Sequence, residues 1–292
     1  MTVSEPTSER GAPRFDDGLP RDAIDEVTAA RGSVYALAAA ALTEPSEGVY
    51  ERFADGSLDE AMTTLVGRSG LDVDPPDLTV EDDRETLAAR YNDLFVVGYS
   101  EVIDGTDGTV ENQGPPASLY ESTYRSDVSW NDVNLDLARA YEHFGCEIGG
   151  DERRHHDHVR LELEFAGYLC RLAAAGGGGV GEAAGADGAT VASDGDDTPA
   201  DEAEPANLDR ARLDFHDRHL SVLSSGLRNA LDEEPGTSVY GRLARFLDAF
   251  VAADVDDLAV RLDAGAGIER EHAVADGSDG DGDDGHNGGE RQ

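Results

Sequence analysis

Apolar side chains recur along this chain at the three- and four-residue spacing of a helix with one buried face. The clearest run forms a broad apolar face from Val159, Leu161, Leu163, Phe165, Tyr168, Leu169 and Leu172. The same periodicity predicts helices over residues 24–42, 58–66, 80–95, 131–144, 159–175, 208–231, 238–252 and 256–262. Alternating strand patterns are absent apart from a short patch at Thr109 and Val110. The pattern therefore predicts an all-α fold.

Three stretches contain almost no large apolar side chains and are predicted to be disordered. They are residues 1–20, the Gly/Ala/Asp-rich insert 176–206 and the acidic tail 265–292. Residues 21–264 remain as one helical-bundle domain that contains the insert. Because the insert would act as a flexible linker between two helices, the chain could be a monomer or a dimer that exchanges its C-terminal helices.

The charge of the chain is far outside the range of ordinary proteins. It carries 63 acidic residues against 23 basic ones, all arginine, and a formal net charge of −40 over 292 residues. This balance is typical of a halophile, because in molar salt the Debye length falls to about 3 Å and screens the repulsion between carboxylates. Without a basic stripe, we expect no binding to nucleic acid.

Cysteine content and hydropathy point to the cytoplasm. Cys146 and Cys170 form no CxxC pair, so a disulfide framework or a zinc ribbon is not expected. No apolar run approaches the roughly 20 residues of a membrane span, and the first residues are polar rather than a signal-peptide core. We therefore expect a cytoplasmic protein without membrane insertion.

The densest candidate chemistry lies just before the apolar run, at His155, His156, Asp157 and His158. These side chains precede or open the predicted helix, where a carboxylate can cap free amide groups and is stabilised by the helix dipole. An acidic helix start that happens to contain histidines explains the segment equally well.

Four motifs in order resemble the landmarks of the TorD/DmsD/NarJ group, which are dedicated cytoplasmic chaperones of molybdenum enzymes. They are Tyr91-Asn92-Asp93-Leu94-Phe95; Pro115-Pro116-Ala117-Ser118-Leu119-Tyr120-Glu121; Asp157-His158 with Leu161-Glu162-Leu163-Glu164-Phe165; and Phe215-His216-Asp217-Arg218-His219-Leu220. The resemblance runs from about residue 35 to residue 252 and skips the insert. Ala117 stands where an aromatic side chain is common, and Leu223 where a tryptophan is often found.

The resemblance implies a binding protein with no cofactor of its own, rather than an enzyme. Its partners would be the catalytic subunit of a molybdopterin oxidoreductase, of the dimethyl-sulfoxide, trimethylamine-oxide or nitrate type, and the twin-arginine leader peptide of that subunit. The chaperone would hold the apoenzyme back from export until the cofactor is inserted. Carried over by motif, the leader-binding groove would include Tyr91, Leu94, Phe95, Pro115, Pro116, Ser118, Tyr120, Asp157 and His158.

The residues themselves fit such a ligand. Paired arginines need carboxylates for bidentate bonds, and the apolar stretch that follows them needs an apolar trough. Asp157 is the first candidate carboxylate, and Glu121, Glu162 or Glu164 could supply a second. Leu94, Phe95, Leu119 and Tyr120 could line the trough. In a chain this acidic, each of these carboxylates could equally be a solvated surface group.

A helical-bundle metal-binding protein is the alternative. Glu152 and His155 have Glu-x-x-His spacing, and His216 with His219 offers a second pair, so His155, His158, His216 and His219 are the candidate ligands. A di-iron bundle would need a second Glu-x-x-His repeat, which is not present. Neither cysteine nor any serine stands in a recognisable catalytic context.

Overall fold

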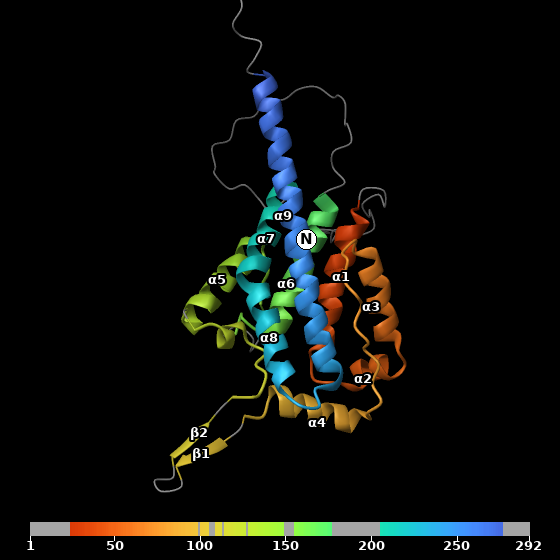
Figure 1. The fold of residues 1–292 in the computed structure, drawn as a ribbon, viewed down its shortest axis with the longest axis vertical. Helices are drawn as coiled ribbons and strands as arrows, with labels where there is room; N and C mark the ends of the chain where they lie inside the picture. The colour runs from red at the N-terminus through yellow and green to blue at the C-terminus, as the bar shows by residue number, and fades with distance from the viewer. Residues whose placement is uncertain are drawn as a thin grey trace, which may run out of the picture.

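The structure, a computed structural model, describes residues 24–98, 100–104, 109–112, 114–126, 128–148, 155–176 and 205–276, which form a helical bundle (Figure 1). Its helices are α1 (Glu26–Ala41), α2 (Glu47–Ala54), α3 (Ser57–Arg68), α4 (Arg84–Phe95), α5 (Trp130–His143), α6 (Val159–Gly176), α7 (Pro205–Phe215), α8 (Ser221–Glu233) and α9 (Ser238–Asp276). A 3-10 helix η2 (Glu121–Tyr124) precedes α5, and a π-helical turn η5 (His216–Leu220) joins α7 to α8. The predicted all-α fold class is confirmed.

Several boundaries differ from the periodicity. The ranges 238–252 and 256–262 form the single helix α9, which continues to Asp276, beyond the boundary predicted at residue 264. The residues between the two ranges contain neither glycine nor proline, so nothing interrupts the helix there. The short α2 was not predicted. The segments 1–20, 177–204 and 277–292, for which disorder was predicted, lie outside the described residues.

A small hairpin interrupts the helical pattern between α4 and η2. Strands β1 (Ser100–Asp104) and β2 (Thr109–Asn112) pair antiparallel, with Val102 opposite Val110, and project from the bundle near α4 (Figure 1). The strand-like patch noted at Thr109 and Val110 lies in β2, whereas β1 was not predicted, because strands of five and four residues are too short for alternation to be recognised.

Helices α1 and α6 lie in close contact because each has a glycine where they meet. A Cβ atom at Gly32 would lie 2.8 Å from the Cβ of Cys170, and one at Gly167 would lie 2.9 Å from the carbonyl oxygen of Gly32. The absent side chains let the two backbones approach. The resulting pair forms the centre of the bundle.

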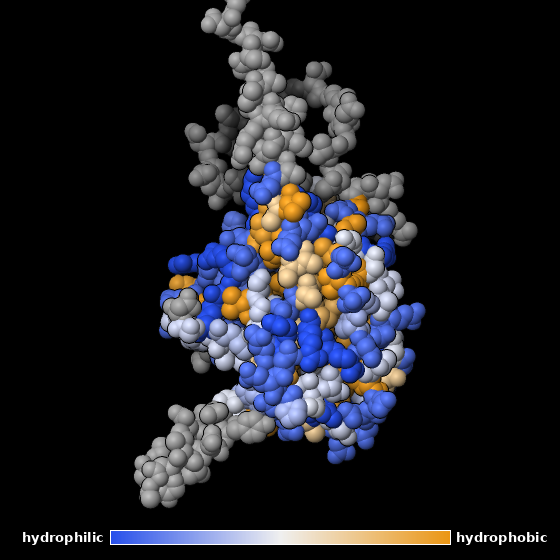
Figure 2. Space-filling model, viewed as in Figure 1, coloured by the Kyte–Doolittle hydropathy of each residue, from blue (hydrophilic) through white to orange (hydrophobic). Residues whose placement is uncertain are grey.

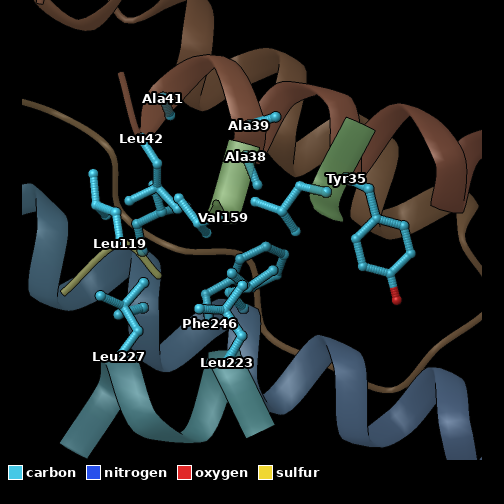
Figure 3. Packing of buried hydrophobic residues seen from close by; sticks show 14 of the residues in the cluster. Tyr35, Ala38, Ala39, Ala41, Leu42, Leu119, Val159, Leu223, Leu227 and Phe246 are labelled. Carbon is cyan, nitrogen blue, oxygen red and sulfur yellow. The ribbon is translucent and has the colours of Figure 1, made fainter. Parts of the chain in front are cut away.

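The hydrophobic core lies between this helix pair and the C-terminal helices. Figure 3 shows Leu42 of the α1 end, Val159 of α6, and Leu223 and Leu227 of α8 converging, and all four side chains are fully buried. Burying such side chains stabilises the fold by roughly 1.5–3 kcal/mol each. On the face shown in Figure 2 most residues are hydrophilic, and hydrophobic ones gather over α9. Among the described residues, no helix is both long and apolar enough to cross a membrane.

A buried ionic network connects α9 to the rest of the bundle. The Asp254 carboxylate accepts hydrogen bonds from Arg31 Nη1 at 2.9 Å, the Tyr35 hydroxyl at 2.9 Å and Arg212 Nη2 at 3.2 Å, and His216 Nε2 lies 3.4 Å away. Burial alone would raise the pKa of Asp254, but His216, Arg212 and Arg31 outweigh it and hold that pKa below its ordinary value. The network fixes α1, α7 and η5 against α9.

Candidate functional site

Three segments that are far apart in the sequence meet at one end of α6. The loop that carries Pro115 and Pro116 is attached to the end of α4 by a bond from the Ala117 amide to the Leu94 carbonyl oxygen, 3.0 Å long. Tyr120 then pairs with His158 in an isolated antiparallel bridge, flanked by a 2.8 Å bond from the Val159 amide to the Leu119 carbonyl oxygen. The second and third sequence motifs are therefore neighbours in space.

The loop is held from within by its own polar groups. The Ser118 hydroxyl lies 2.9 Å from the Thr123 hydroxyl, and the Tyr124 hydroxyl donates to the Ser118 carbonyl oxygen at 2.6 Å. The Tyr124 ring in turn packs on α8 at Gly226, where an added Cβ would lie 2.6 Å from the ring atom Cδ1. Because Gly226 has no side chain, the Tyr124 ring can pack directly on α8, and this contact positions the loop that carries Tyr120.

A hollow of about 350 Å³ opens beside this bridge. Its walls come from the end of α1 and the residues after it, from α4, from the loop and from the start of α6: Leu42, Thr43, Glu44, Tyr91, Tyr120, His155, His158, Arg160 and Leu161. The ring centroid of Tyr120 lies 5.3 Å from that of His155 and 5.1 Å from that of His158. The hollow is therefore walled by aromatic rings.

One carboxylate reaches this hollow from the solvent side. Glu44 is exposed and lines it, and its charge acts on the Tyr91 hydroxyl. Burial, with smaller contributions from Glu44 and Tyr120, raises the pKa of Tyr91 to about 12. Aromatic rings beside an accessible carboxylate favour a cation, because ring faces carry negative potential.

Asp157 lies beneath the hollow rather than in its wall. Its side chain is fully buried, and its Oδ2 atom accepts a 2.5 Å bond from the Ser122 hydroxyl and a longer one from the Ser122 amide. Its carbonyl oxygen accepts a 2.9 Å bond from the Glu121 amide. These bonds tie the loop before α6 to η2, so Asp157 stabilises the bridge from inside.

Two further buried carboxylates share this region. Glu121 and Glu162 are fully buried; Glu121 is paired with Arg125 and lies 3.0 Å from His219 Nδ1. Neither carboxylate oxygen of Glu162 has a hydrogen-bond partner. Burial, then the charges of Glu121 and Asp157, raise the pKa of Glu162 well above its ordinary value. Burial and the two neighbouring carboxylates therefore favour the neutral form of Glu162, and its side chain does not reach the surface.

The structure divides the predicted groove residues into two groups. Tyr91, Tyr120 and His158 line the hollow, and Pro115 and Pro116 are half-buried in the loop beside it. Tyr91 itself is only 7% exposed, and the other buried members are Leu94, Phe95, Ser118, Asp157 and Glu162, with exposures of 5%, 6%, 8%, 0% and 0%. Leu94 and Phe95 belong to the hydrophobic core rather than to an open trough.

Sequence reasoning did not single out Glu44, Arg160 or Leu161. Leu161 was assigned to the apolar face of its helix, and Glu44 was one acidic residue among many. The only local signal is that Glu44 precedes Pro45, at the turn where α1 has ended. Its importance comes from the packing of that turn against α4 and α6.

The four histidines of the metal-binding alternative are placed apart. His155 and His158 contact Tyr120, whereas His216 donates from Nδ1 to the Arg212 carbonyl oxygen and faces Asp254. His219 bonds Glu121. Within the described ranges no three histidine, cysteine, aspartate or glutamate side chains are arranged to hold a metal ion, and Glu152 lies outside those ranges. The structure gives this alternative no support.

Comparison with known proteins agrees with the motif order. The family model described as nitrate reductase delta subunit matches residues 55–187. The selenate reductase assembly chaperone protein of Thauera selenatis is 29% identical over 225 residues, 77% of this chain and 87% of that protein. The chlorate reductase assembly chaperone protein of Ideonella dechloratans is 37% identical over 87 residues, which cover 30% of this chain and 38% of that protein.

A third relative spans most of both chains. The perchlorate reductase assembly chaperone protein of Dechloromonas aromatica (strain RCB) is 24% identical over 235 residues, 80% of this chain and 92% of that protein. All three relatives are named as assembly chaperones rather than as catalysts. In its four ordered motifs, in the match over residues 55–187 and in these relatives, the chain is similar to reductase assembly chaperones of the TorD/DmsD/NarJ type.

Proposed function

We propose that this maturation chaperone acts in the cytoplasm, where it binds the twin-arginine leader and the apo form of a molybdopterin oxidoreductase. Binding would support cofactor insertion and keep the unfinished enzyme from export. The observation that carries the proposal is the hollow beside the bridge of Tyr120 and His158, in which an accessible carboxylate, Glu44, stands among aromatic rings.

An arginine side chain fits this hollow in three respects. Its planar guanidinium can stack on Tyr120 and on an imidazole of His155 or His158, and can form two parallel bonds to the Glu44 carboxylate. In molar salt, contact with aromatic rings still contributes to the binding free energy, whereas an exposed ion pair alone contributes little. The combination therefore suits a protein whose charge indicates a saline cytoplasm.

We assign different roles to the two acidic residues of the site. Glu44 is the carboxylate that contacts the guanidinium, because it is exposed and lines the hollow. Asp157 supports the bridge through Ser122 and does not touch the peptide. Phe95 and Leu94 act in the same indirect way, by holding α4 in place.

The client is the catalytic subunit of a molybdopterin reductase of the dimethyl-sulfoxide, trimethylamine-oxide or nitrate type. The names of the three relatives refer to selenate, chlorate and perchlorate reductases, and selenate, chlorate and perchlorate are all oxyanions. Among the three types, these names favour a client that reduces an oxyanion such as nitrate.

Calorimetric titration in molar potassium chloride tests the proposal. A peptide with the twin-arginine leader of the client should bind wild type more tightly than the same peptide with two lysines, since lysine cannot form the bidentate pair. Glu44→Gln should weaken arginine-peptide binding up to about fivefold, because an exposed ion pair is worth roughly 0.2–1 kcal/mol. Glu47→Gln, which removes a nearby exposed charge outside the hollow, is the matched control.

Equal affinity of wild type for the two peptides, or no binding of either, would contradict leader recognition. If Glu44→Gln and Glu47→Gln weaken binding equally, the effect is one of net charge, and the assignment of Glu44 fails.

A further inference from the structure

A second hollow, of about 300 Å³, lies further along the outer face of α6. Its apolar walls are Cys146, Ile148, Leu161, Phe165 and Tyr168. We infer that this hollow receives the apolar stretch that follows the arginines of the leader. The inference rests on the proposed function and adds to it the place and the direction of the bound peptide.

The two hollows share one wall residue. Leu161 lines both of them, with His158 on one side and Phe165 and Tyr168 on the other. These four positions are three, four and three residues apart, so they lie along one stripe of the α6 surface. A ligand that enters beside His158 and continues along α6 therefore passes directly into the second hollow.

The length of the stripe sets the register of the peptide. Ten residues separate His158 from Tyr168, which at 1.5 Å per residue is about 15 Å. An extended peptide covers about 15 Å in four to five residues, at roughly 3.3–3.6 Å each. Apolar side chains four to five positions after the bound arginine would thus reach Tyr168, and the peptide would run in the same direction as α6.

The second hollow is preformed and has fixed walls. The Tyr168 hydroxyl donates to the Phe144 carbonyl oxygen at 3.2 Å, and the guanidinium of Arg171 lies 5.9 Å from the Tyr168 ring centroid. On the rim, Glu164 is paired with Arg160 at 2.8 Å, which neutralises the charge between the two hollows. An apolar segment can therefore enter without Glu164 losing its partner, and Glu147, the other carboxylate that lines the hollow, is exposed.

The size of the hollow favours a peptide over a second copy of the chain. About 300 Å³ is at the lower end of ligand pockets and accommodates a few side chains of one segment. A stable two-fold interface would need about 800 Å² of surface from each partner. An apolar peptide segment joined to an arginine head matches both hollows at once.

Cys146 provides a native probe of the second hollow. It is half-buried in the wall, and burial raises the pKa of its thiol, whereas Cys170 is fully buried and burial raises the pKa of that thiol to about 12. A maleimide should therefore modify Cys146 and spare Cys170. Saturating leader peptide should slow the modification of Cys146 at least tenfold in molar potassium chloride. A Cys146→Ser variant, which should not react, confirms which thiol is measured.

Two further comparisons isolate the apolar contact. A peptide that keeps both arginines but replaces the apolar stretch with serine and glycine should leave Cys146 reactive, even at concentrations that saturate the first hollow. Ile148→Ser should weaken binding of the full leader about tenfold without changing the affinity for the arginine-only peptide. Val260→Ser, at a valine that is 68% exposed on α9, is the matched control and should change neither.

The outcomes separate the inference from the function on which it rests. If the leader binds through Glu44 but does not protect Cys146, the inference is overturned and the proposed function stands. If no leader binds at all, both fail. If Cys146 reacts more slowly as the protein concentration rises in the absence of peptide, a second copy of the chain covers the hollow and the inference is also overturned.

Discussion

His219 Nδ1 on the π-helical turn η5 lies 3.0 Å from the Glu121 Oε2 atom on η2. The same histidine reaches Asp136 of α5 through Nε2 at 3.2 Å. One imidazole therefore connects the last sequence motif to the loop that carries Tyr120 and to α5. A π turn places side chains differently from an α-helix and is often found at functional positions. Here it lets His216 and His219 both be buried while serving different networks.

The buried Glu162 should make stability depend on pH. Its folded pKa is raised, so its contribution to stability is complete below the pKa of the unfolded state and declines as pH rises from about 4.5 toward the folded pKa. Glu162→Gln keeps the shape and removes the charge. The variant should therefore lose less stability than wild type between pH 5 and pH 8.

Denaturant unfolding at pH 5 to 8 in molar salt measures this difference. Glu164→Gln, two residues later on the opposite side of α6, changes a half-exposed carboxylate that is paired with Arg160, and should leave the pH dependence of the free energy of unfolding unchanged. A Glu162→Gln protein with the same decline toward alkaline pH as wild type would contradict the assignment.

Among the polar groups of the fold, those of the Asp254 network should cause the largest loss of stability when they are substituted. Asp254→Asn removes the fully buried carboxylate that Arg212 and Arg31 share and leaves them only their outer partners Asp209 and Asp257. Breaking a buried pair costs up to about 3–5 kcal/mol, and these remaining partners should keep the loss at or below the lower end of that range. Because the folded pKa of Asp254 is lowered, its contribution is present above pH 4 and is lost as pH falls through that folded pKa. The free energy of unfolding of Asp256→Asn, an exposed carboxylate two residues later, should remain within about 0.5 kcal/mol of wild type.

Two glycines in helices should respond to alanine in opposite directions. Gly67 of α3 has open space around its Cβ position, so Gly67→Ala should stabilise the protein by roughly 0.5–1 kcal/mol. Gly226→Ala should destabilise it by about 1–3 kcal/mol, because the methyl group overlaps the Tyr124 ring. Thermal melts give both signs, and leader titration should show weaker binding only for Gly226→Ala. Stabilisation by Gly226→Ala would mean that the ring is free to move.

Salt should control whether the chain folds. The chain has a formal net charge of −40. Dilution from molar potassium chloride to about 0.01 M lengthens the Debye length to roughly 30 Å, so the repulsion between carboxylates is no longer screened. The helical circular-dichroism signal should fall on dilution and return when salt is restored. A signal that is unchanged at low salt would show that the charge is not an adaptation to salinity.

Much of the fold follows from local pattern alone. The helices that contain Tyr91, Leu137 and Leu163 were predictable because each places apolar side chains at helical spacing, and a helix closes its own hydrogen bonds within the segment. The order of the four motifs was likewise a property of the chain itself. The two-stranded hairpin and the π turn were not predictable, since they are too short to produce a periodic signal.

The site was decided by tertiary packing. Asp157 and Glu44 are both acidic residues near helix ends, and nothing in their sequence neighbourhoods shows that the first is sealed under Ser122 while the second faces a hollow. Whether a carboxylate is solvated, paired or buried depends on segments dozens of residues away that pack against it. The sequence thus determined most of the helices and the order of the four motifs. Only tertiary structure, through the close contact of α1 with α6 and the bridge between Tyr120 and His158, decided which side chains a ligand can reach.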